Sequence, residues 1–359
     1  MTSRIDSDSR RAQVVGIGLI GGSIGMALRA GGWHVTGFDR DAVRVEKGVA
    51  LGALDASGFD EDAAITFIAT PVGAVAEVAA ECLAKGSGVV TDVGSAKHAI
   101  VSAVPEGRFV GGHPMAGSEQ EGVEGAHPEL FEGSVWVLTP VEGTDPGAHA
   151  LVRSVVASLG AEVVELSPQR HDALVAMVSH VPHLTAASLM GLAAEGAEEH
   201  RALLRLAAGG FRDMTRIAAG HPGIWPDICV ENRDAIVDVL RRLEEELART
   251  RSLVERGDRA GVLDVLERAR AARVNLPARL ARTAEMAEVR IPVPDRPGVL
   301  AEVTTLASEL GVDIADLEIA HSAEGDAGVL ILVIEGAASD RLRGALAARG
   351  YHASMRSLA

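Results

Sequence analysis

The residues best suited to chemistry lie in the run Gly111-Gly112-His113-Pro114-Met115-Ala116-Gly117-Ser118-Glu119. A histidine imidazole titrates close to neutral pH, so a rigidly held His113 can take up a proton and return it during a reaction. The glycines and the proline make the run irregular, which predicts a loop. A loop histidine considered alone is more often solvated or bound for structural reasons, so the rest of the chain decides whether His113 is catalytic.

A second candidate site is Gly16-Ile17-Gly18-Leu19-Ile20-Gly21-Gly22-Ser23, which follows a predicted strand and opens a predicted helix. In this pattern Gly16 permits a tight turn, Gly18 lets the backbone approach a pyrophosphate and Gly21 allows close helix packing. Asp39 ends the next predicted strand, where a carboxylate accepts a hydrogen bond from a ribose 2′-hydroxyl. The pattern predicts NAD as the cofactor, and Arg40 beside Asp39 leaves NADP open.

Two further predicted strands end at Thr70-Pro71 and at Thr91-Asp92, and Val93-Gly94-Ser95-Ala96-Lys97 follows the second. Ligands bind outside the carboxyl ends of parallel strands, so we expect Ser95 and Lys97 to face the nicotinamide and the substrate. A Ser95 hydroxyl near His113 would orient the imidazole or share the oxygen that it deprotonates. The predicted cofactor contacts are Gly16, Gly18, Leu19, Ile20, Gly21, Asp39, Arg40, Thr70, Pro71 and Asp92.

Two motifs in a later helical stretch carry polar groups suited to an organic acid. Ser179-His180-Val181-Pro182-His183 places Ser179 and His183 on one helix face, and Pro182 predicts a bend there. A structural histidine at a kink is the alternative interpretation. Arg212 or Arg216 can bind a carboxylate through two hydrogen bonds, although a surface arginine paired with a glutamate explains either residue equally well.

The elements that must position these groups fall into three predicted domains. Residues 11–167 alternate β-branched runs with amphipathic helices, which indicates an α/β Rossmann-type domain with a doubly wound parallel sheet. Residues 168–286 show apolar spacing of three and four and predict an all-helical domain. Residues 288–359 read as strand, helix, strand, strand, helix, strand, the βαββαβ order of a ferredoxin-like unit.

The composition narrows the class of protein. The 359 residues include 50 Asp and Glu against 34 Lys and Arg. The resulting net charge of −16 argues against a protein that binds nucleic acid. The polar N-terminus lacks the apolar core of a signal peptide, and no uninterrupted run of about 18 apolar residues occurs. Cys82 and Cys229 suggest neither a disulfide nor a metal site. We therefore expect a cytoplasmic metabolic protein without a membrane or a metal.

Five motifs, in the order in which they follow along the chain, resemble those of the prephenate dehydrogenase family of tyrosine biosynthesis. Members of this family oxidise prephenate or its transaminated form, arogenate. The resemblance covers about residues 12–240. The C-terminal unit resembles an ACT domain, a sensor of small molecules that often binds amino acids. The motifs are Gly16 to Ser23, Thr91 to Lys97, Gly112 to Glu119, Ser179 to His183 and Asp213-Met214-Thr215-Arg216-Ile217-Ala218.

The family resemblance implies a role for each matched residue. His113 binds the ring hydroxyl at C4 and helps remove its proton as hydride leaves for NAD, and Ser95 supports the same oxygen. Arg216 binds a substrate carboxylate, and loss of the ring carboxylate as CO2 completes an aromatic ring. Further implied substrate contacts are Ser179, His183, Glu119, Asp213 and Trp225, with Lys97 adding positive potential.

The ACT resemblance implies regulation by tyrosine or another aromatic amino acid, and a homodimer is expected. The implied effector residues are Asp295, Arg296, Pro297, Gly298, Val299 and Leu300, with the segment 320–326. A purely structural dimerisation role for this unit stays open. The residues also leave prephenate and arogenate open as substrates, and the pair Gln120-Glu121 departs from the basic or small polar pair common in the family.

Two other functions fit parts of the sequence. A β-hydroxyacid dehydrogenase also joins a dinucleotide domain to a helical one, but its chemistry usually relies on a lysine in the helical domain. Every lysine of this chain lies before residue 98. A catalytically silent amino-acid sensor is the alternative from another class, and the presence of His113, Ser95 and Arg216 argues against it.

Overall fold

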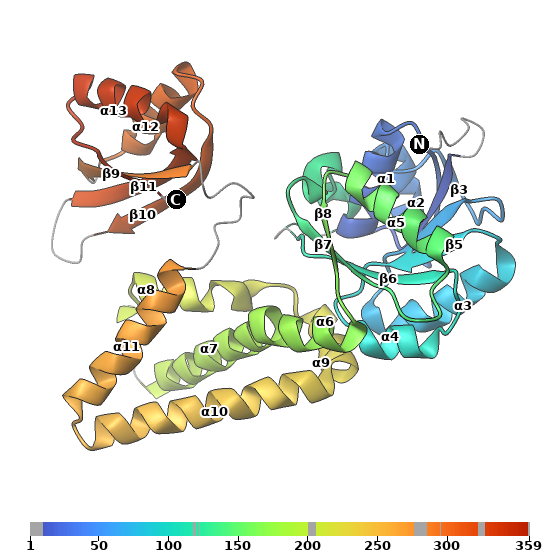
Figure 1. Cartoon of the computed structure of the whole chain (residues 1–359), viewed down its shortest axis with the longest axis horizontal. Coiled ribbons are helices and arrows are strands. Elements are labelled where there is room, and N and C mark those ends of the chain that lie inside the picture. Colours follow the sequence, from blue (N-terminus) through green and yellow to red (C-terminus); the bar gives the residue numbers. More distant parts are fainter. Residues whose placement is uncertain are drawn as a thin grey trace. The chain divides into compact units, whose positions relative to one another are not determined.

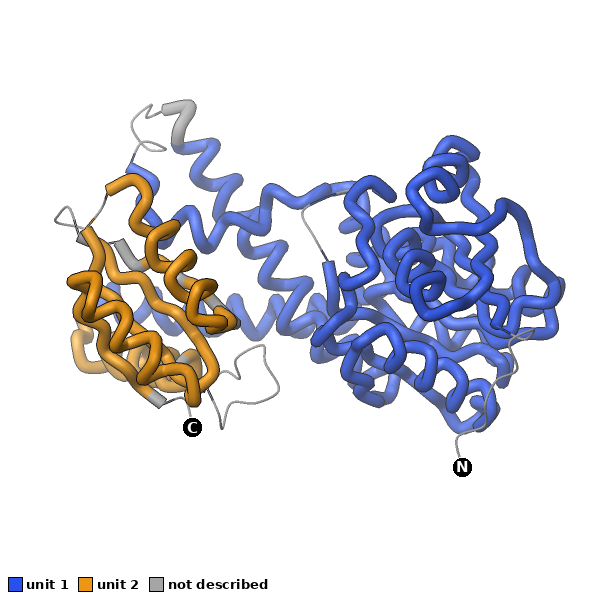
Figure 2. The backbone as a smooth tube through the Cα atoms, turned by 90° about the horizontal axis from the view of Figure 1, so that it is seen from above, with its two compact units in different colours: residues 1–257 blue, residues 258–359 orange. Residues whose placement is uncertain are grey.

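The computed structural model describes residues 10–117, 120, 122–199, 206–275, 286–294, 296–321 and 327–357. The predicted site residues Glu119 and Asp295 lie outside the described residues, as do Ser118, Glu121 and most of the segment 320–326. The chain forms two compact units, residues 1–257 and 258–359, coloured separately in Figure 2. The boundary predicted near residue 167 falls inside the first unit.

The first unit contains an eight-stranded sheet in the order β3-β2-β1-β4-β5-β6-β7-β8 (Figure 1). The order runs outward from β1 in both directions, which is the doubly wound arrangement expected from the sequence. The strands are β1 (Arg11–Val15), β2 (His34–Phe38), β3 (Ala56–Ser57), β4 (Ile65–Ile68), β5 (Val89–Asp92), β6 (Phe109–Pro114), β7 (Val135–Thr139) and β8 (Glu162–Glu165).

Helices cover both faces of this sheet because successive side chains of a strand point to opposite faces. Val14 of β1 joins a core with Ile24 of α1, whereas Val15 joins a second core with Val75 of α3. The first core takes side chains from α1 (Leu19–Ala30), α2 (Ala42–Ala50) and α5 (Pro146–Ser158). The second takes them from α3 (Val75–Lys85), α4 (His98–Ala103) and α9 (Trp225–Glu231).

The sheet departs from the prediction at β6 and β7. Along the sheet, each neighbouring pair in the order β3-β2-β1-β4-β5-β6 is parallel. Strands β6 and β7 are antiparallel, and β7 and β8 are parallel to each other, so these last two strands run against the others. Between β6 and β7 the described residues form the short 3₁₀ turns Val123–Gly125 and Pro128–Phe131 and no crossover helix. A parallel pair needs a crossover that carries the chain back to the start of the sheet, usually as a helix, whereas this connection leaves β7 beside β6 in the antiparallel direction.

His113 belongs to strand β6, and the predicted loop is therefore wrong. His113 pairs with Val137 of β7. The preceding glycines allow neighbouring groups to approach the strand: a Cβ at Gly111 would lie 2.5 Å from Thr139 Oγ1, and one at Gly112 would lie 2.7 Å from the Asp92 carbonyl oxygen. The glycines thus indicate tight packing at this point.

The rest of the first unit is helical, as expected. Helix α6 (Pro168–Val175) has Ser167 as its N-cap and continues through a π-helical turn, Ala176–His180, into α7. Pro182 has no N–H for the Val178 carbonyl, and the π turn lies where the sequence predicted a bend. The other elements are α7 (Val181–Glu199), α8 (Gly209–Thr215), the 3₁₀ turns η7 (Arg216–Ala219) and η8 (Pro222–Ile224), and α10 (Arg233–Glu255).

The continuous helix Pro168–Gly196 is the one described helix whose length and composition would suit a membrane span. Its most apolar window has a mean hydropathy of 1.4, and 28% of that window is buried. The buried side carries His171, Asp172 and His180, whose polar groups bond to neighbouring elements. One side of this helix therefore packs against the rest of the first unit, and its other side is exposed.

The second unit contains helix α11 (Arg259–Val274) and a four-stranded antiparallel sheet in the order β10-β11-β9-β12. Two helices follow β9 and β11, and their apolar side chains share one core with the sheet. The elements are β9 (Met286–Pro294), α12 (Val299–Glu309), β10 (Ile314–His321), β11 (Ala327–Glu335), α13 (Ser339–Ala348) and β12 (Ser354–Ser357).

The glycines of the β1–α1 turn give a first test. A Cβ at Gly21 would lie 1.9 Å from the Gly16 carbonyl oxygen, whereas a Cβ at Gly18 meets nothing within 4 Å. We expect Gly21→Ala to lower the free energy of unfolding by about 1–3 kcal/mol, because backbone atoms must move. Gly18→Ala is the matched control and costs less than about 1 kcal/mol. Equal destabilisation in urea unfolding would contradict this packing.

Candidate active site

The turn between β1 and α1 has the shape of a dinucleotide-binding loop. Gly16 has a φ of +97°, which favours glycine, and the space over Gly18 is open at the start of α1. The Asp39 carboxylate accepts the Ile17 N–H at 2.8 Å and the Asp41 N–H at 2.9 Å, so it lies beside the turn. An open backbone, a helix N-terminus and a nearby carboxylate fit the pyrophosphate and ribose of a dinucleotide.

Asp92 and Lys97 form a completely buried ion pair at the end of β5. The same carboxylate accepts the Gly94 N–H at 2.9 Å and the Gly112 N–H at 3.1 Å. Neither side chain reaches the surface, so the ion pair itself presents no exposed group to a ligand, and the contacts predicted for Lys97 with the substrate and for Asp92 with the cofactor stay predictions. The pair instead fastens the loop that carries Ser95 to the strand that carries His113.

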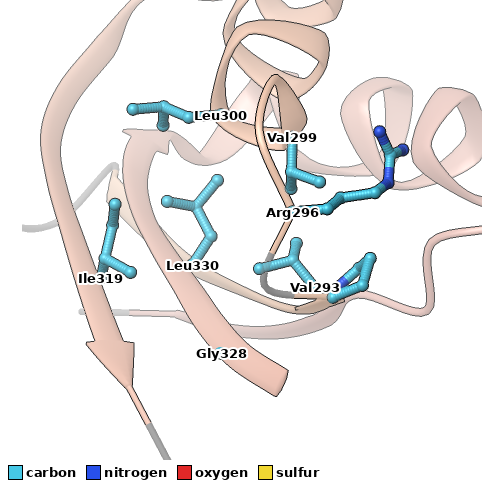
Figure 3. Close-up of a pocket in the computed structure, with 8 residues that line it drawn as sticks. Val293, Arg296, Val299, Leu300, Ile319, Gly328 and Leu330 are labelled. Atoms are coloured by element: carbon cyan, nitrogen blue, oxygen red, sulfur yellow. The ribbon is translucent and has the colours of Figure 1, made fainter. Parts of the chain in front are cut away.

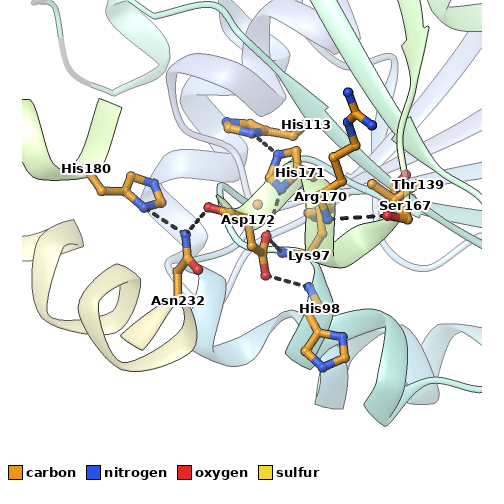
Figure 4. A network of polar contacts seen from close by, with 12 residues as sticks. Lys97, His98, His113, Thr139, Ser167, Arg170, His171, Asp172, His180 and Asn232 are labelled. Carbon is orange, nitrogen blue, oxygen red and sulfur yellow. Dashed lines mark hydrogen bonds and ion pairs between the residues drawn. The ribbon is translucent and has the colours of Figure 1, made fainter. Parts of the chain in front are cut away.

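A chain of buried polar groups leads from His113 into helix α6 (Figure 4). His113 Nδ1 lies 2.8 Å from His171 Nε2, and His171 Nδ1 lies 2.8 Å from Asp172 Oδ1. The Asp172 carboxylate also accepts the backbone N–H groups of Lys97 and His98, at 2.8 and 2.9 Å. The helix is thereby tied to the loop after β5.

The surroundings determine which of these polar groups are charged. Burial is the main cause that lowers the pKa of His113 well below its usual 6.5, and the nearby His171, Lys97 and His180 lower it further. Burial alone raises the pKa of Asp172, but the hydrogen bonds from His171 and from two backbone N–H groups outweigh this effect and lower it. At neutral pH the site therefore holds a neutral imidazole and an ionised carboxylate.

Two further histidines come from the predicted Ser179–His183 motif. Burial lowers the pKa of His180 to about 4, and its Nδ1 lies 3.1 Å from Asn232 Nδ2. The His183 ring stacks on Trp225 of α9, with centroids 3.6 Å apart and planes at 14°. The structure thus brings together two residues that the sequence predicted separately, while Ser179 lies half-buried in the π turn.

The remaining predicted residues lie on elements around this motif. Arg216 begins η7, which packs against α7, and a Cβ on Gly220 after this turn would lie 3.7 Å from His183 Cε1. Asp213 is exposed on α8, and Thr70 and Pro71 follow β4 as predicted. Arg40 is exposed after β2.

Comparisons with known proteins agree with this arrangement. Residues 24–165 match the family model "Prephenate dehydrogenase, nucleotide-binding domain", and residues 167–268 match "Prephenate dehydrogenase, dimerization domain". A prephenate dehydrogenase of Bacillus subtilis (strain 168) is 34% identical over 334 residues, which cover 88% of this chain and 90% of the relative. The chain belongs to the prephenate dehydrogenase family.

Solved structures of the family have the same fold. Prephenate dehydrogenase from A. aeolicus, in complex with hydroxyphenyl propionate and NAD+, has a TM-score of 0.71 at 31% identity and covers 75% of this chain and 98% of its own. Synechocystis arogenate dehydrogenase has a TM-score of 0.65 at 31% identity and covers 73% of this chain and 98% of its own.

Sequence reasoning missed His171, Asp172 and Asn232. A partial signal existed for the first two, because Ser167-Pro168 starts a helix and so places a His-Asp pair within its first turns. Asn232 gave no signal, since it lies between α9 and α10 and bonds to groups far away in the sequence. Its Nδ2 donates to the Asp172 carbonyl oxygen at 3.0 Å.

The buried ion pair gives the second prediction. Lys97→Met leaves the Asp92 carboxylate buried without its cation, and we expect a loss of about 3–5 kcal/mol in the free energy of unfolding. The double variant Lys97→Met with Asp92→Asn removes the uncompensated charge and recovers part of this loss. Denaturant unfolding of both variants measures the difference. A Lys97→Met protein as stable as the unaltered chain would contradict the assignment.

Proposed function

We propose that this chain catalyses the NAD-dependent oxidative decarboxylation of prephenate to 4-hydroxyphenylpyruvate. The observation that carries the proposal is a neutral, half-buried His113 at the end of a strand whose neighbour, β5, leads into the loop with Ser95. His113 and the Ser95 loop belong to the same sheet, whose first turn, between β1 and α1, fits a dinucleotide. Membership of the family supplies the substrate class.

His113 is the base of the proposed reaction. The C4 hydroxyl donates its proton to the neutral imidazole, and Ser95 hydrogen-bonds the same oxygen. NAD, when bound, accepts the hydride that leaves C4. Loss of the ring carboxylate as CO2 then forms the aromatic ring, and the imidazolium returns the proton to the phenolic oxygen. The histidine thus ends the cycle in its starting state.

The substrate's other groups fall to residues of the helical part. Arg216 binds a carboxylate through its planar guanidinium, and Ser179 and His183 contact the side-chain end. Trp225 fixes the His183 ring by stacking, which supports a shaped pocket there. Asp213 and Glu119 are proposed at the pocket rim. The cofactor contacts are Gly16, Gly18, Leu19, Ile20, Gly21, Asp39, Arg40, Thr70 and Pro71.

Arogenate is the second candidate substrate. The similarity to Synechocystis arogenate dehydrogenase equals in identity that to the prephenate enzyme of A. aeolicus, 31% in both cases. The two substrates differ in a keto group against an ammonium at one end. Initial rates with prephenate and arogenate under the same conditions decide which one this chain prefers.

A cytoplasmic homodimer is the proposed assembly. The match to a dimerization domain supports it, and so do apolar side chains that the single chain leaves exposed on the helical part. Examples are Val178, which is 66% exposed, Leu192, which is 68% exposed, and Val230, which is 70% exposed. Burying such a surface against a second copy is favourable.

The C-terminal residues 288–359 are proposed as a ferredoxin-like ACT domain that binds an aromatic amino acid, beside the domains 11–167 and 168–286. Its support is the element order βαββαβ and an apolar pocket at the start of α12 (Figure 3). Arg296, Val299 and Leu300 of the predicted effector set line this pocket. The other lining residues are Val293, Pro294, Ile319, Gly328 and Leu330.

The reaction gives the third prediction. The chain incubated with NAD and prephenate or arogenate produces NADH, followed by absorbance, and no NADH with either substrate would overturn the proposed function. His113→Asn removes the base and lowers kcat at least ~100-fold, with NAD binding retained. Near-normal turnover by this variant would show that His113 is a structural residue.

The lowered pKa of His113 gives the fourth prediction, for kcat/KM. The base is active when neutral, so its contribution is complete above pH 6.5 and is lost only as the pH falls through the lowered pKa. We therefore expect kcat/KM to stay level from pH 8 to about 6.5. A fall in kcat/KM that is centred at or above pH 6.5 in the unaltered chain, and is absent only from the His113→Asn variant, would contradict a base that is neutral at these pH values.

Effector binding gives the fifth prediction. Tyrosine inhibits the unaltered chain, and Leu300→Asp in the apolar pocket abolishes this inhibition without changing turnover in the absence of tyrosine. Ala347→Asp, on the exposed side of α13, is the control and leaves inhibition intact. Inhibition that survives Leu300→Asp would place the effector elsewhere, and no response to tyrosine, phenylalanine or tryptophan would favour a structural role.

A further inference from the structure

The polar chain behind His113 has a defined direction of hydrogen donation. An ionised carboxylate only accepts hydrogen bonds, so at 2.8 Å the His171 Nδ1–H must donate to Asp172 Oδ1. A neutral histidine protonated at Nδ1 carries a lone pair at Nε2. A neutral His171 that donates from Nδ1 to Asp172 thus accepts a hydrogen bond at Nε2.

The same reasoning extends to His113. Its Nδ1 lies 2.8 Å from His171 Nε2, so a neutral His171 that accepts there takes its hydrogen bond from the Nδ1–H of His113. The second nitrogen, Nε2, then holds a lone pair, which is what a base needs. The orientation originates at Asp172, whose carboxylate is held by two backbone N–H groups independently of the histidines.

We propose that His171 and Asp172 are positioning residues that hold His113 as the Nδ1–H tautomer and so present its Nε2 lone pair to the substrate. The inference rests on the proposed function. When His113 accepts the C4 hydroxyl proton at Nε2, its Nδ1–H continues to donate to His171, and the buried Asp172 carboxylate stabilises the new positive charge through that ring. The proton leaves again for the phenolic oxygen.

The burial of His171 and Asp172 argues against an incidental contact between them and His113. His171 is completely buried and Asp172 is 5% exposed, although helix α6 could have exposed both. A buried histidine next to a buried carboxylate is costly unless its hydrogen bonds are satisfied. Here both ring nitrogens of His171 are used, one by the carboxylate and one by the proposed base.

The direct test is the tautomer of His113 in the unaltered chain. In protein labelled with ¹⁵N-histidine, protonated and unprotonated ring nitrogens give well-separated NMR signals, and the signals lost in His113→Asn identify this ring. We expect a protonated Nδ1 and an unprotonated Nε2 at pH 7.5 without substrate. The opposite tautomer would overturn the proposal. This readout needs no turnover, so absence of NADH would contradict the proposed function alone.

Variants test the effect on rate. Asp172→Asn can place its amide N–H₂ against His171 Nδ1, which reverses both tautomers, and His171→Leu removes the acceptor. Each should lower kcat ~100-fold with less than threefold change in the KM for NAD. His171→Gln restores an acceptor and should recover about tenfold relative to His171→Leu. Gln169→Leu, exposed on the same helix, is the matched control with unchanged kcat.

The outcomes separate positioning from stability. If His171→Leu folds and keeps kcat within threefold of the unaltered chain, the proposal is wrong. If His171→Leu and His171→Gln lose the same activity in proportion to lost folded protein, measured by circular dichroism, the role is structural and the proposal is also wrong. Should Asp172→Asn fail to fold, the tautomer measured in the unaltered chain still decides.

Discussion

The Asp172 carboxylate is the group on which the site depends. It lies in the interior, where an ionised oxygen without donors is very unfavourable, and it obtains donors from His171, from the Lys97 backbone and from the His98 backbone. These donors belong to two separate segments, helix α6 and the residues from the loop after β5 to the start of α4. Satisfying one carboxylate therefore fixes the helical part of the first unit against the end of the sheet.

A second buried carboxylate, Asp92, acts on the other side of the same loop. It neutralises the Lys97 ammonium and accepts the Gly94 and Gly112 N–H groups, which join the Ser95 loop to strand β6. Lys97 thus connects the two carboxylates, its ammonium on Asp92 and its backbone on Asp172. The result is a rigid base for His113, as proton transfer between fixed groups requires.

Much of the fold could be predicted from local sequence patterns. The turn Gly16 to Gly21, the strand alternation and the apolar spacing of the helical stretch after residue 167 depend on neighbours a few residues apart, and these elements are present in the structure. His113 itself was found because histidine chemistry is visible in the residue type. The interpretation of its surroundings as a loop was wrong, because glycines that admit a neighbouring strand and glycines that bend a loop have the same local appearance.

The sequence by itself determined which groups are available: a dinucleotide turn, a histidine base, a serine and an arginine in an order typical of one family. Only the tertiary structure decided how those groups are connected. Lys97 became an interior cation, and His171 and Asp172 became the neighbours of His113, because burial and hydrogen bonding depend on segments that meet in space after folding. A hydrogen bond between residues 113 and 171 leaves no periodic pattern in the chain, so no reading of spacing alone could have found it.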